Sequence, residues 1–244
     1  MPNHQPETIV ITGASGGIGL ALLNTLAEHY PNAQITATYH SSEPLAQPQA
    51  NSTIQWQALD LTDAQAVDQF AQGFNRVDWL INCAGLLHQG DHGPEKSIRQ
   101  FDSDFFQRNI QINTLPTLLL SQAFSGALKN SPQAIFASLS ARVGSISDNR
   151  LGGWYSYRIS KAALNMAIKT LAIEWQRSHK NVCVAALHPG TTDTELSKPF
   201  QRNVPVDKLF TPQQSAGYLL QVIQGLNAEN SGQLWAWDGQ TIPW

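Results

Sequence analysis

Short runs of apolar residues recur along the chain, and longer segments with a helical apolar period separate them. Several runs are apolar at every position, which is typical of central strands in a parallel sheet covered by helices on both faces. The runs that predict strands are Thr8–Thr12, Gln34–Tyr39, Ile54–Leu59, Val77–Asn82, Ala134–Leu139, Val182–Leu187 and Gln233–Trp237. A parallel sheet of seven strands is therefore expected.

The intervening segments predict helices. They run from Gly17 to about His29, from a cap at Thr62 through Phe70, over Ser97–Asn109, Thr114–Leu128 and Tyr155–Arg177, and from Thr211 to Leu226. Strands that alternate with helices indicate right-handed crossovers, and so a doubly wound α/β sheet of the Rossmann type. No repeat or break in composition divides residues 1–244, so a single domain is expected. Segment Thr191–Leu209, which has prolines and charges but no clear period, predicts a mobile lid over the substrate.

Composition restricts the partners of this domain. With 42% hydrophobic residues, 14% charged residues and a net charge of -3, the chain offers no electrostatic basis for binding nucleic acid or an anionic membrane. No apolar run reaches the roughly 18 residues of a membrane span, and residues 1–7 lack the pattern of a signal peptide. Cys83 and Cys183 lie inside apolar runs, which favours buried, reduced thiols and a cytoplasmic location.

A glycine-rich turn directly follows the first predicted strand. Residues 12–19 read TGASGGIG and open the first predicted helix. The pyrophosphate of a dinucleotide is a doubly charged anion, and it suits the free N–H groups and positive end of a helix N-terminus. Gly13, Gly17 and Gly19 serve the tight turn, the close approach of the phosphate and the contact between helix and sheet. The position of the motif therefore predicts a dinucleotide site.

Further motifs follow in a recognisable order. Asp60 follows the third strand, Asn82-Cys83-Ala84-Gly85 ends the fourth, Asn113 lies near a helix boundary, Tyr157-x-x-x-Lys161 opens the longest helix, and Pro189-Gly190 follows the sixth strand. With the T-G-x-x-x-G-x-G turn, this set resembles the short-chain dehydrogenase/reductase family. The segments SARVGSISDN and WDGQTIPW look most like its C-factor-like carbonyl reductases.

The resemblance implies a nicotinamide cofactor and a set of residues that bind it. The expected binding residues are Gly13, Ser15, Gly17, Ile18, Gly19, His40, Asp60, Leu61, Asn82, Ala84, Gly85, Tyr157, Lys161, Pro189, Gly190, Thr192 and Thr194. The second strand ends in Thr38-Tyr39-His40-Ser41-Ser42, with no carboxylate before Glu43. An acidic group there would repel the 2′-phosphate of NADP, whereas an imidazole and hydroxyls can bind it. NADP(H) is therefore expected over NAD(H).

Tyr157 and Lys161 are the expected catalytic pair. Reduction of a carbonyl adds hydride to carbon and a proton to oxygen, and a free tyrosine with a pKa of about 10 gives up its proton reluctantly. An ammonium one helical turn away favours tyrosinate and lowers that pKa. The alternative is that the two residues form a solvent-facing pair on an amphipathic helix. The position of Tyr157 and Lys161 at the carboxyl edge of the sheet, where such folds bind ligands, favours an active site instead. The resemblance implies that Lys161 also binds the ribose hydroxyls and that Asn113 holds a water.

The serine that the family uses to bind the substrate oxygen is out of place. It is normally the second serine of S-S-x-x-G, but residues 138–144 read SLSARVG and put Ala141 there, one position after Ser140. Either a local shift lets Ser140 serve as the fourth catalytic residue, which we favour, or the hydroxyl is missing. Ser145 is a more distant candidate. Because one such donor is typically worth about 100- to 1000-fold in rate, weak activity is a real alternative.

Other features of the sequence give weaker evidence of function. His88, Asp91 and His92 share a glycine-rich loop, but no fourth ligand is near, so no metal site is expected. Trp154, Tyr155 and Phe200 are candidate walls of the substrate pocket. The sequence as a whole predicts a reversible NADPH-dependent reductase of small apolar or aromatic carbonyl compounds. The alternative is a dinucleotide-binding signalling protein with little turnover. The family resemblance also implies a dimer or tetramer built on helices 114–128 and 155–177.

Overall fold

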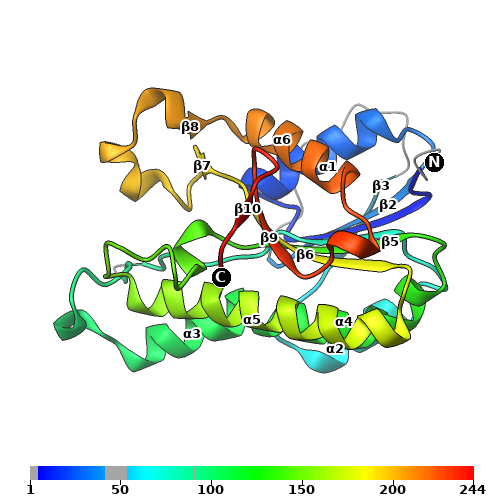
Figure 1. Ribbon diagram of the computed structural model, residues 1–244, viewed down its shortest axis with the longest axis horizontal. Helices are drawn as coiled ribbons and strands as arrows, with labels where there is room; N and C mark the ends of the chain where they lie inside the picture. Colours follow the sequence, from blue (N-terminus) through cyan, green and yellow to red (C-terminus); the bar gives the residue numbers. More distant parts are fainter. Residues whose placement is uncertain (1–4, 42–53, 91) are drawn as a thin grey trace.

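The computed structural model describes residues 5–41, 54–90 and 92–244. Its centre is an eight-stranded sheet in the order β10-β9-β6-β5-β4-β1-β2-β3, parallel except for the β9–β10 pair (Figure 1). The strands of this sheet are β1 (Thr8–Thr12), β2 (Gln34–Tyr39), β3 (Ile54–Ala58), β4 (Trp79–Asn82), β5 (Ala134–Leu139), β6 (Val182–His188), β9 (Gln233–Ala236) and β10 (Thr241–Ile242). Strands β7 (Thr191–Thr192) and β8 (Leu209–Phe210) pair with each other outside it.

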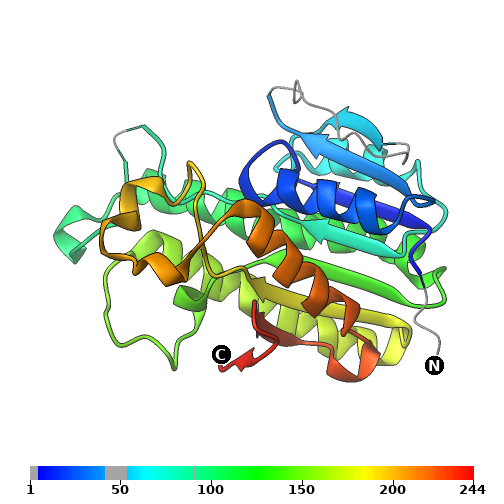
Figure 2. The same cartoon turned by 90° about the horizontal axis from the view of Figure 1, so that it is seen from above.

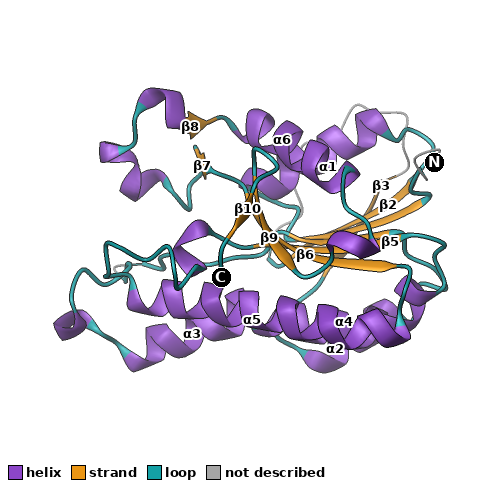
Figure 3. Ribbon diagram, viewed as in Figure 1, coloured by secondary structure: helices purple, strands orange, loops and turns teal. Residues whose placement is uncertain are grey.

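Helices cover both faces of the sheet, as Figure 3 shows by colour. Helices α1 (Gly17–His29) and α6 (Pro212–Gln224) pack together on one face. The opposite face carries α2 (Ala64–Ala71), α3 (Ser103–Asn113), α4 (Leu115–Lys129) and α5 (Tyr155–Ser178). Short 3₁₀ turns are η1 (Ile98–Gln100), η2 (Arg142–Gly144), η3 (Lys198–Asn203), η4 (Val206–Lys208) and η5 (Ala228–Asn230). The predicted doubly wound α/β sheet is confirmed.

An apolar core lies on each side of the sheet. Side chains such as Leu22 and Ile223 fill the layer beneath α1 and α6, and Phe124 and Ile168 fill the layer above α4 and α5; all are fully buried. Burying one side chain of this size stabilises the fold by about 1.5–3 kcal/mol. The two layers hold the strands so that their carboxyl ends meet along one edge. The chain order reverses there between β1 and β4, which is where such folds bind ligands.

Strand β10 is absent from the predicted seven strands. It has only two residues, returns antiparallel onto β9 after a turn, and is too short to show an apolar period. The N-cap predicted at Thr62 is wrong by one residue. The Asp63 side chain caps α2 by accepting from the backbone N–H groups of Gln65 and Ala66, at 2.9 and 3.1 Å. Thr62 instead donates its N–H and hydroxyl to Asp60.

The single helix predicted over Ser97–Asn109 is also wrong in its bounds. The turn η1 ends at Gln100, and Asp102 in extended conformation caps a new helix by accepting from the N–H of Phe105 at 2.7 Å. Asp is a strong N-cap residue, so the chain restarts there and α3 continues to Asn113. No helix in the described ranges is both long and apolar enough to cross a membrane.

Candidate active site

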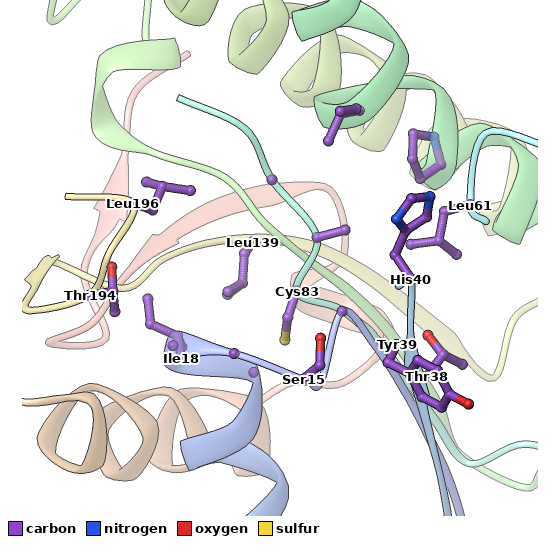
Figure 4. A pocket seen from close by; sticks show the side chains of 18 of the residues that line it. Ser15, Ile18, Thr38, Tyr39, His40, Leu61, Cys83, Leu139, Thr194 and Leu196 are labelled. Carbon is purple, nitrogen blue, oxygen red and sulfur yellow. The ribbon is translucent and has the colours of Figure 1, made fainter. Parts of the chain in front are cut away.

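A cleft of about 540 Å³ opens where the parallel strands end (Figure 4). Figure 2 shows this edge of the sheet from above, with the start of α1 beside the loops that follow the strands. The predicted site residues that line it are Gly13, Ser15, Gly17, Ile18, Gly19, His40, Asp60, Leu61, Ala84, Gly85, Ser140, Tyr157, Lys161, Pro189 and Thr194. The cleft also has lining residues that sequence reasoning did not single out, above all Arg108, Ile112, Leu139, Glu195 and Leu196.

The glycine turn is packed too tightly for side chains. Gly13 has a φ of +66°, and a Cβ there would lie 2.7 Å from the backbone nitrogen of Ala84. A Cβ on Gly19 would lie 2.2 Å from the carbonyl oxygen of Gly13. Helix α1 begins after Gly16 without a side-chain cap and without an acidic residue in its first turn. Its first N–H groups are therefore available to an anion in the cleft.

The end of the cleft at β2 carries a mixed set of charges. Asp60 accepts from the N–H and hydroxyl of Thr62 at 2.8 and 2.7 Å, and these bonds hold the pKa of Asp60 below its usual value. His40 Nε2 lies 3.8 Å from the other Asp60 carboxylate oxygen, and both side chains are exposed. Arg108 reaches the same end from α3 and makes no hydrogen bond or ion pair with any residue that the structure describes. Ser42 and Glu43 lie outside the described residues.

A buried polar network holds three strand ends together. The Thr12 hydroxyl donates to Asn82 Oδ1 at 3.0 Å, and the same oxygen accepts from the N–H of Ala84 at 3.1 Å. Asn82 Nδ2 donates to the hydroxyl of Thr117, which bonds Ser138 at 3.0 Å. Asn82 is 3% exposed and does not line the cleft. It fixes the ends of β1, β4 and β5 on α4 and shapes the cofactor cleft indirectly.

Tyr157 and Lys161 lie on the first turns of α5 and line the cleft. Lys161 Nζ donates to the carbonyl of Leu139 at 2.9 Å and lies 5.7 Å from the centroid of the Tyr157 ring. Burial raises the pKa of Tyr157 and lowers the pKa of Lys161 to about 8. The predicted lowering of the tyrosine pKa is therefore not found in the chain alone, because removal of the phenol from water disfavours its charged form.

Asn113, the last residue of α3, lies behind the Tyr157–Lys161 pair and bonds the same helix. Its Oδ1 accepts from the N–H of Leu86 at 2.7 Å, and its Nδ2 donates to the Leu86 carbonyl and to the Ser160 hydroxyl. A Cβ added to Gly85 would lie 3.4 Å from Asn113 Oδ1 and 3.6 Å from Lys161 Nζ. The side chain of Asn113 is buried and does not line the cleft, and it ties the loop after β4 to α5.

The two candidate hydroxyls near the position where the family has its serine differ in their surroundings. Ser140 lines the cleft, and its hydroxyl donates to Asn165 Oδ1 at 2.6 Å. Ala141 precedes η2 and offers no hydroxyl. Ser145 is buried and donates to the carbonyl of Pro243, so it is held by the C-terminal segment. Of these hydroxyl groups, Ser140 is the one placed at the cleft.

Only some of the cofactor-binding residues predicted in the turn after β6 line the cleft. Pro189 and Thr194 line the cleft, whereas the Thr192 hydroxyl is buried and donates to Ser215 at 3.0 Å. A Cβ on Gly190 would lie 2.5 Å from the Phe210 ring, so Gly190 permits close packing away from the cleft. Thr194 lies so near the phosphate turn that a Cβ on Gly17 would be 3.1 Å from its methyl group.

Aromatic rings lead away from Tyr157 toward segment 191–209. The Trp154 ring centroid is 6.2 Å from that of Tyr157 and 5.3 Å from that of Phe200, and Phe200 is 5.9 Å from the ring of His88. Trp154 therefore lies beside Tyr157 and Phe200 lies beside Trp154, although neither Trp154 nor Phe200 lines the cleft itself. Tyr155 has no ring contact among the described residues.

His88 contacts a backbone carbonyl and His92 contacts an aromatic ring. His88 Nε2 is 3.1 Å from the carbonyl oxygen of Glu195, and His92 stacks on Phe105. Asp91 lies outside the described residues. The contacts of the two histidines fix the loop after β4 to its neighbours.

Trp154 is held in a strained backbone conformation. With a φ of 55° it is the one non-glycine residue of the described chain in the left-handed region, and Gly152 and Gly153 before it are left-handed too. The buried carboxylate of Glu95 accepts from the N–H of Ser156 at 3.1 Å and from its hydroxyl, while the Glu95 carbonyl accepts from the N–H of Trp154. Residues held in a strained backbone conformation cluster at functional sites, which makes Trp154, beside Tyr157, a candidate for a functional role.

Comparison with known proteins agrees with this geometry. The family described as short chain dehydrogenase matches residues 7–205. The chain belongs to this family. It is 30% identical over 242 residues to 1-hydroxy-2-glutathionyl-2-methyl-3-butene dehydrogenase of Rhodococcus, which covers 98% of this chain and 100% of that protein. The Myxococcus xanthus protein C-signal is 32% identical over 168 residues, 69% of this chain and 93% of its own.

A solved structure extends the likeness to the whole fold. The NADPH-bound carbonyl reductase from chicken fatty liver superposes with a TM-score of 0.83 at 26% identity, covering 99% of this chain and 100% of that one. This short-chain dehydrogenase is therefore an oxidoreductase with a carbonyl reductase-like relationship.

Proposed function

We propose that this short-chain dehydrogenase is an NADP(H)-dependent carbonyl reductase that can run in reverse as an alcohol dehydrogenase. The observation that carries the proposal is the buried Tyr157–Lys161 pair in the wall of a cleft whose other end is a glycine turn with free helical N–H groups. The reduced nicotinamide supplies the hydride when bound. The chain's own residues bind it, orient the carbonyl and provide the proton.

The cofactor would extend along the cleft. The turn at Gly13, Gly17 and Gly19, with Ser15 and Ile18, suits the pyrophosphate, because backbone N–H groups face it and no acidic side chain opposes it. Asp60, Leu61, Ala84 and Gly85 suit the adenosine half, and Pro189 and Thr194 suit the nicotinamide half. Asn82, Gly190 and Thr192 act behind the cleft wall by fixing these loops.

Tyr157 is the proposed proton donor. Because burial raises its pKa, the phenol carries its proton at neutral pH and can give it to the carbonyl oxygen as negative charge develops there. The Lys161 ammonium stabilises negative charge on the Tyr157 oxygen and so opposes the rise in the tyrosine pKa. The hydrogen bond from Lys161 Nζ to the Leu139 carbonyl holds the ammonium in place. Asn113 supports the same helix from the loop after β4 and is the proposed anchor of a water that returns the proton.

The aromatic rings beside Tyr157 favour a substrate with an aryl or apolar group next to the carbonyl. Trp154 keeps its indole near the phenol despite the cost of its backbone conformation, and an edge-to-face aromatic pair of this kind is worth about 0.5–1.5 kcal/mol beyond burial. Segment Thr191–Leu209 carries Phe200 and, through Thr194, Glu195 and Leu196, part of the cleft wall. We infer that this segment closes over the bound substrate.

Turnover assays test the proposal directly. Consumption of NADPH is followed with a panel of aryl ketones, alkyl ketones and aldehydes. We expect turnover, fastest with aryl ketones. The alternative is a signalling protein, as the similarity to C-signal allows. Tight NADPH binding with no turnover on any member of the panel would favour that alternative.

The preference for NADP(H) rests on the end of the cleft at β2. His40 and Arg108 can both face a 2′-phosphate, and the carbonyl reductase from chicken fatty liver was solved with NADPH bound. Arg108→Ala is expected to weaken NADPH binding about tenfold and leave NADH binding unchanged, since a charge-assisted bond is worth about 1.5–3 kcal/mol. His40→Asp should reverse the preference. Both are measured by fluorescence titration, with Arg177→Ala as the control.

The preference is wrong if the wild-type protein binds NADH as tightly as NADPH. It is also wrong if Arg108→Ala weakens both cofactors alike, because such a loss would indicate a role in adenosine binding or in folding.

The pH profile of reduction should report Lys161. Its pKa of about 8 lies below the ordinary value of 10.5, so the ammonium is present below pH 8 and is lost as pH rises through that value. We expect kcat/KM for reduction to fall above about pH 8. Lys161→Arg, whose charge persists to higher pH, should have a lower rate but no such fall up to about pH 10. A wild-type profile that stays flat to pH 10 would contradict the assignment.

An exposed apolar stripe on α5 supports self-association. Ile159, Met166 and Ile173 repeat every seven residues and are 45%, 65% and 50% exposed, and Leu118 of α4 is 45% exposed. A stripe of this kind is typical of a helix that packs against another subunit. Met166→Lys should shift the wild-type oligomer toward monomer in analytical ultracentrifugation. Val206→Lys, at a residue 93% exposed on η4, is the control and should not.

A wild-type protein that sediments as a monomer would rule out this interface. The free thiols of Cys83 and Cys183 further favour a cytoplasmic location for the assembly.

A further inference from the structure

Ser140 and Asn165 form a buried pair in the wall of the cleft. Ser140 is 4% exposed and Asn165 3% exposed, and the serine hydroxyl donates to Asn165 Oδ1 at 2.6 Å. A hydroxyl has one proton to donate. In this arrangement the proton of Ser140 is committed to the amide, so the hydroxyl cannot donate to the oxygen of a substrate.

The other end of the same amide has no partner. Asn165 Nδ2 is fully buried and makes no hydrogen bond within the described part of the chain. Buried amide donors are rarely left unsatisfied in native proteins, and each exception calls for an explanation. Rotating the amide by half a turn exchanges its oxygen and nitrogen. Asn165 Nδ2 then donates to the oxygen of Ser140, and no other hydrogen bond of Asn165 is lost, because among the described residues Oδ1 has only Ser140 as its partner.

We propose that Asn165 is a positioning residue that makes Ser140 a hydrogen-bond donor to the substrate oxygen. This inference rests on the proposed function. After the rotation, Ser140 accepts from Asn165 and its own proton is free to point into the cleft. A bound carbonyl favours the rotated state, since the substrate oxygen gains a donor and the buried N–H group gains an acceptor.

The local packing places Asn165 where this exchange can act. Tyr157, Lys161 and Asn165 lie at intervals of four residues on α5, so they share one face of the helix. Gly144 at the end of η2 packs directly on that face. A Cβ there would lie 2.8 Å from Lys161 Cβ and 3.0 Å from Asn165 Nδ2. The close approach brings the end of β5 against Asn165, so the donor comes from Ser140 rather than from position 141.

Kinetics of four variants test the role. Ser140→Ala is expected to lower kcat about 100-fold, the lower end of the usual effect of losing one such donor. Asn165→Leu removes the orienting amide and is expected to lower kcat about tenfold. The double variant, Ser140→Ala with Asn165→Leu, should have the kcat of Ser140→Ala alone, because Asn165 acts only through Ser140. Ala141→Ser in the Ser140→Ala background supplies a hydroxyl at the neighbouring position and should not restore kcat, because Asn165 bonds residue 140 rather than residue 141. NADPH affinity should remain near wild type in all four.

Asn165→Asp keeps the size and the acceptor oxygens but has no N–H group when ionised. It is expected to hold the Ser140 proton and to lower kcat as far as Ser140→Ala does, which keeps the test decisive if the leucine variant does not fold. The inference is overturned if the losses of Ser140→Ala and Asn165→Leu multiply, or if Asn165→Asp has the wild-type kcat. If wild-type protein reduces no carbonyl compound, the proposed function fails and the inference with it. If wild type turns over and Ser140→Ala is equally fast, only the inference fails.

Discussion

Tyr157→Phe is expected to lower kcat for carbonyl reduction by at least about 100-fold while leaving NADPH affinity unchanged. A positioned acid typically contributes about 100- to 10,000-fold, and phenylalanine has no proton to give. The ring of Tyr157 is 8% exposed and contacts Trp154, and phenylalanine preserves both the burial and the ring contact. The loss should therefore appear in kcat, measured under NADPH saturation with the best ketone of the panel.

Tyr30→Phe is the matched control for this variant. Tyr30 lies at the C-terminal end of α1, where its hydroxyl accepts from Gln224 Nε2 at 3.0 Å, and it does not line the active-site cleft. Its loss should leave kcat at the wild-type value. If Tyr157→Phe retained wild-type kcat, Tyr157 would not be the proton donor, and another acid at the cleft would have to be sought.

Gly19→Ala should have the second largest effect, on cofactor binding. The added Cβ would lie 2.2 Å from the carbonyl oxygen of Gly13, which is backbone and cannot yield as a flexible side chain would. The start of α1 and the turn must move apart, and overpacking of this kind costs about 1–3 kcal/mol. We expect NADPH affinity to fall about tenfold or more and the melting temperature to fall by about 2–10 °C.

Gly126→Ala provides the control for the change of residue type. Gly126 is exposed in the last turn of α4, and a Cβ there would meet no atom within 4 Å. Alanine is favoured over glycine in a helix interior by about 1 kcal/mol, so this variant should be slightly more stable and bind NADPH normally. Unchanged NADPH affinity in Gly19→Ala would show that the glycine turn is not the pyrophosphate site.

The sequence predicts those parts of the fold whose signals are local. Central strands such as Val182–Leu187 are apolar throughout and were placed within a residue of their observed bounds. Strand β10 could not be predicted, because two residues carry no period and its pairing with β9 depends on the turn between them. The break before α3 depends on Asp102, whose capping bond competes with continuation of the helix from η1.

In the candidate site too, the residues of local motifs could be predicted, whereas those brought together only by the fold could not. The glycine turn and the Tyr157–Lys161 spacing were readable because each lies within one turn or helix. Arg108 was missed because only the fold brings α3 to the residue that ends β2. The bond between Ser140 and Asn165 joins two segments that no local pattern relates. The pKa of Tyr157 was predicted in the wrong direction for the chain alone, because it depends on burial that spacing does not reveal.

A crystal structure with NADP⁺ bound would show directly whether Tyr157 and Lys161 face the reacting ring of the cofactor. We expect the pyrophosphate on the N–H groups at the start of α1 and the nicotinamide ring beside Tyr157 and Lys161. The phenol hydroxyl should then be within hydrogen-bond reach of a carbonyl placed over the ring. A nicotinamide ring lying elsewhere, or a Tyr157 hydroxyl turned away from it, would contradict the account and leave a nucleotide-binding protein without this chemistry.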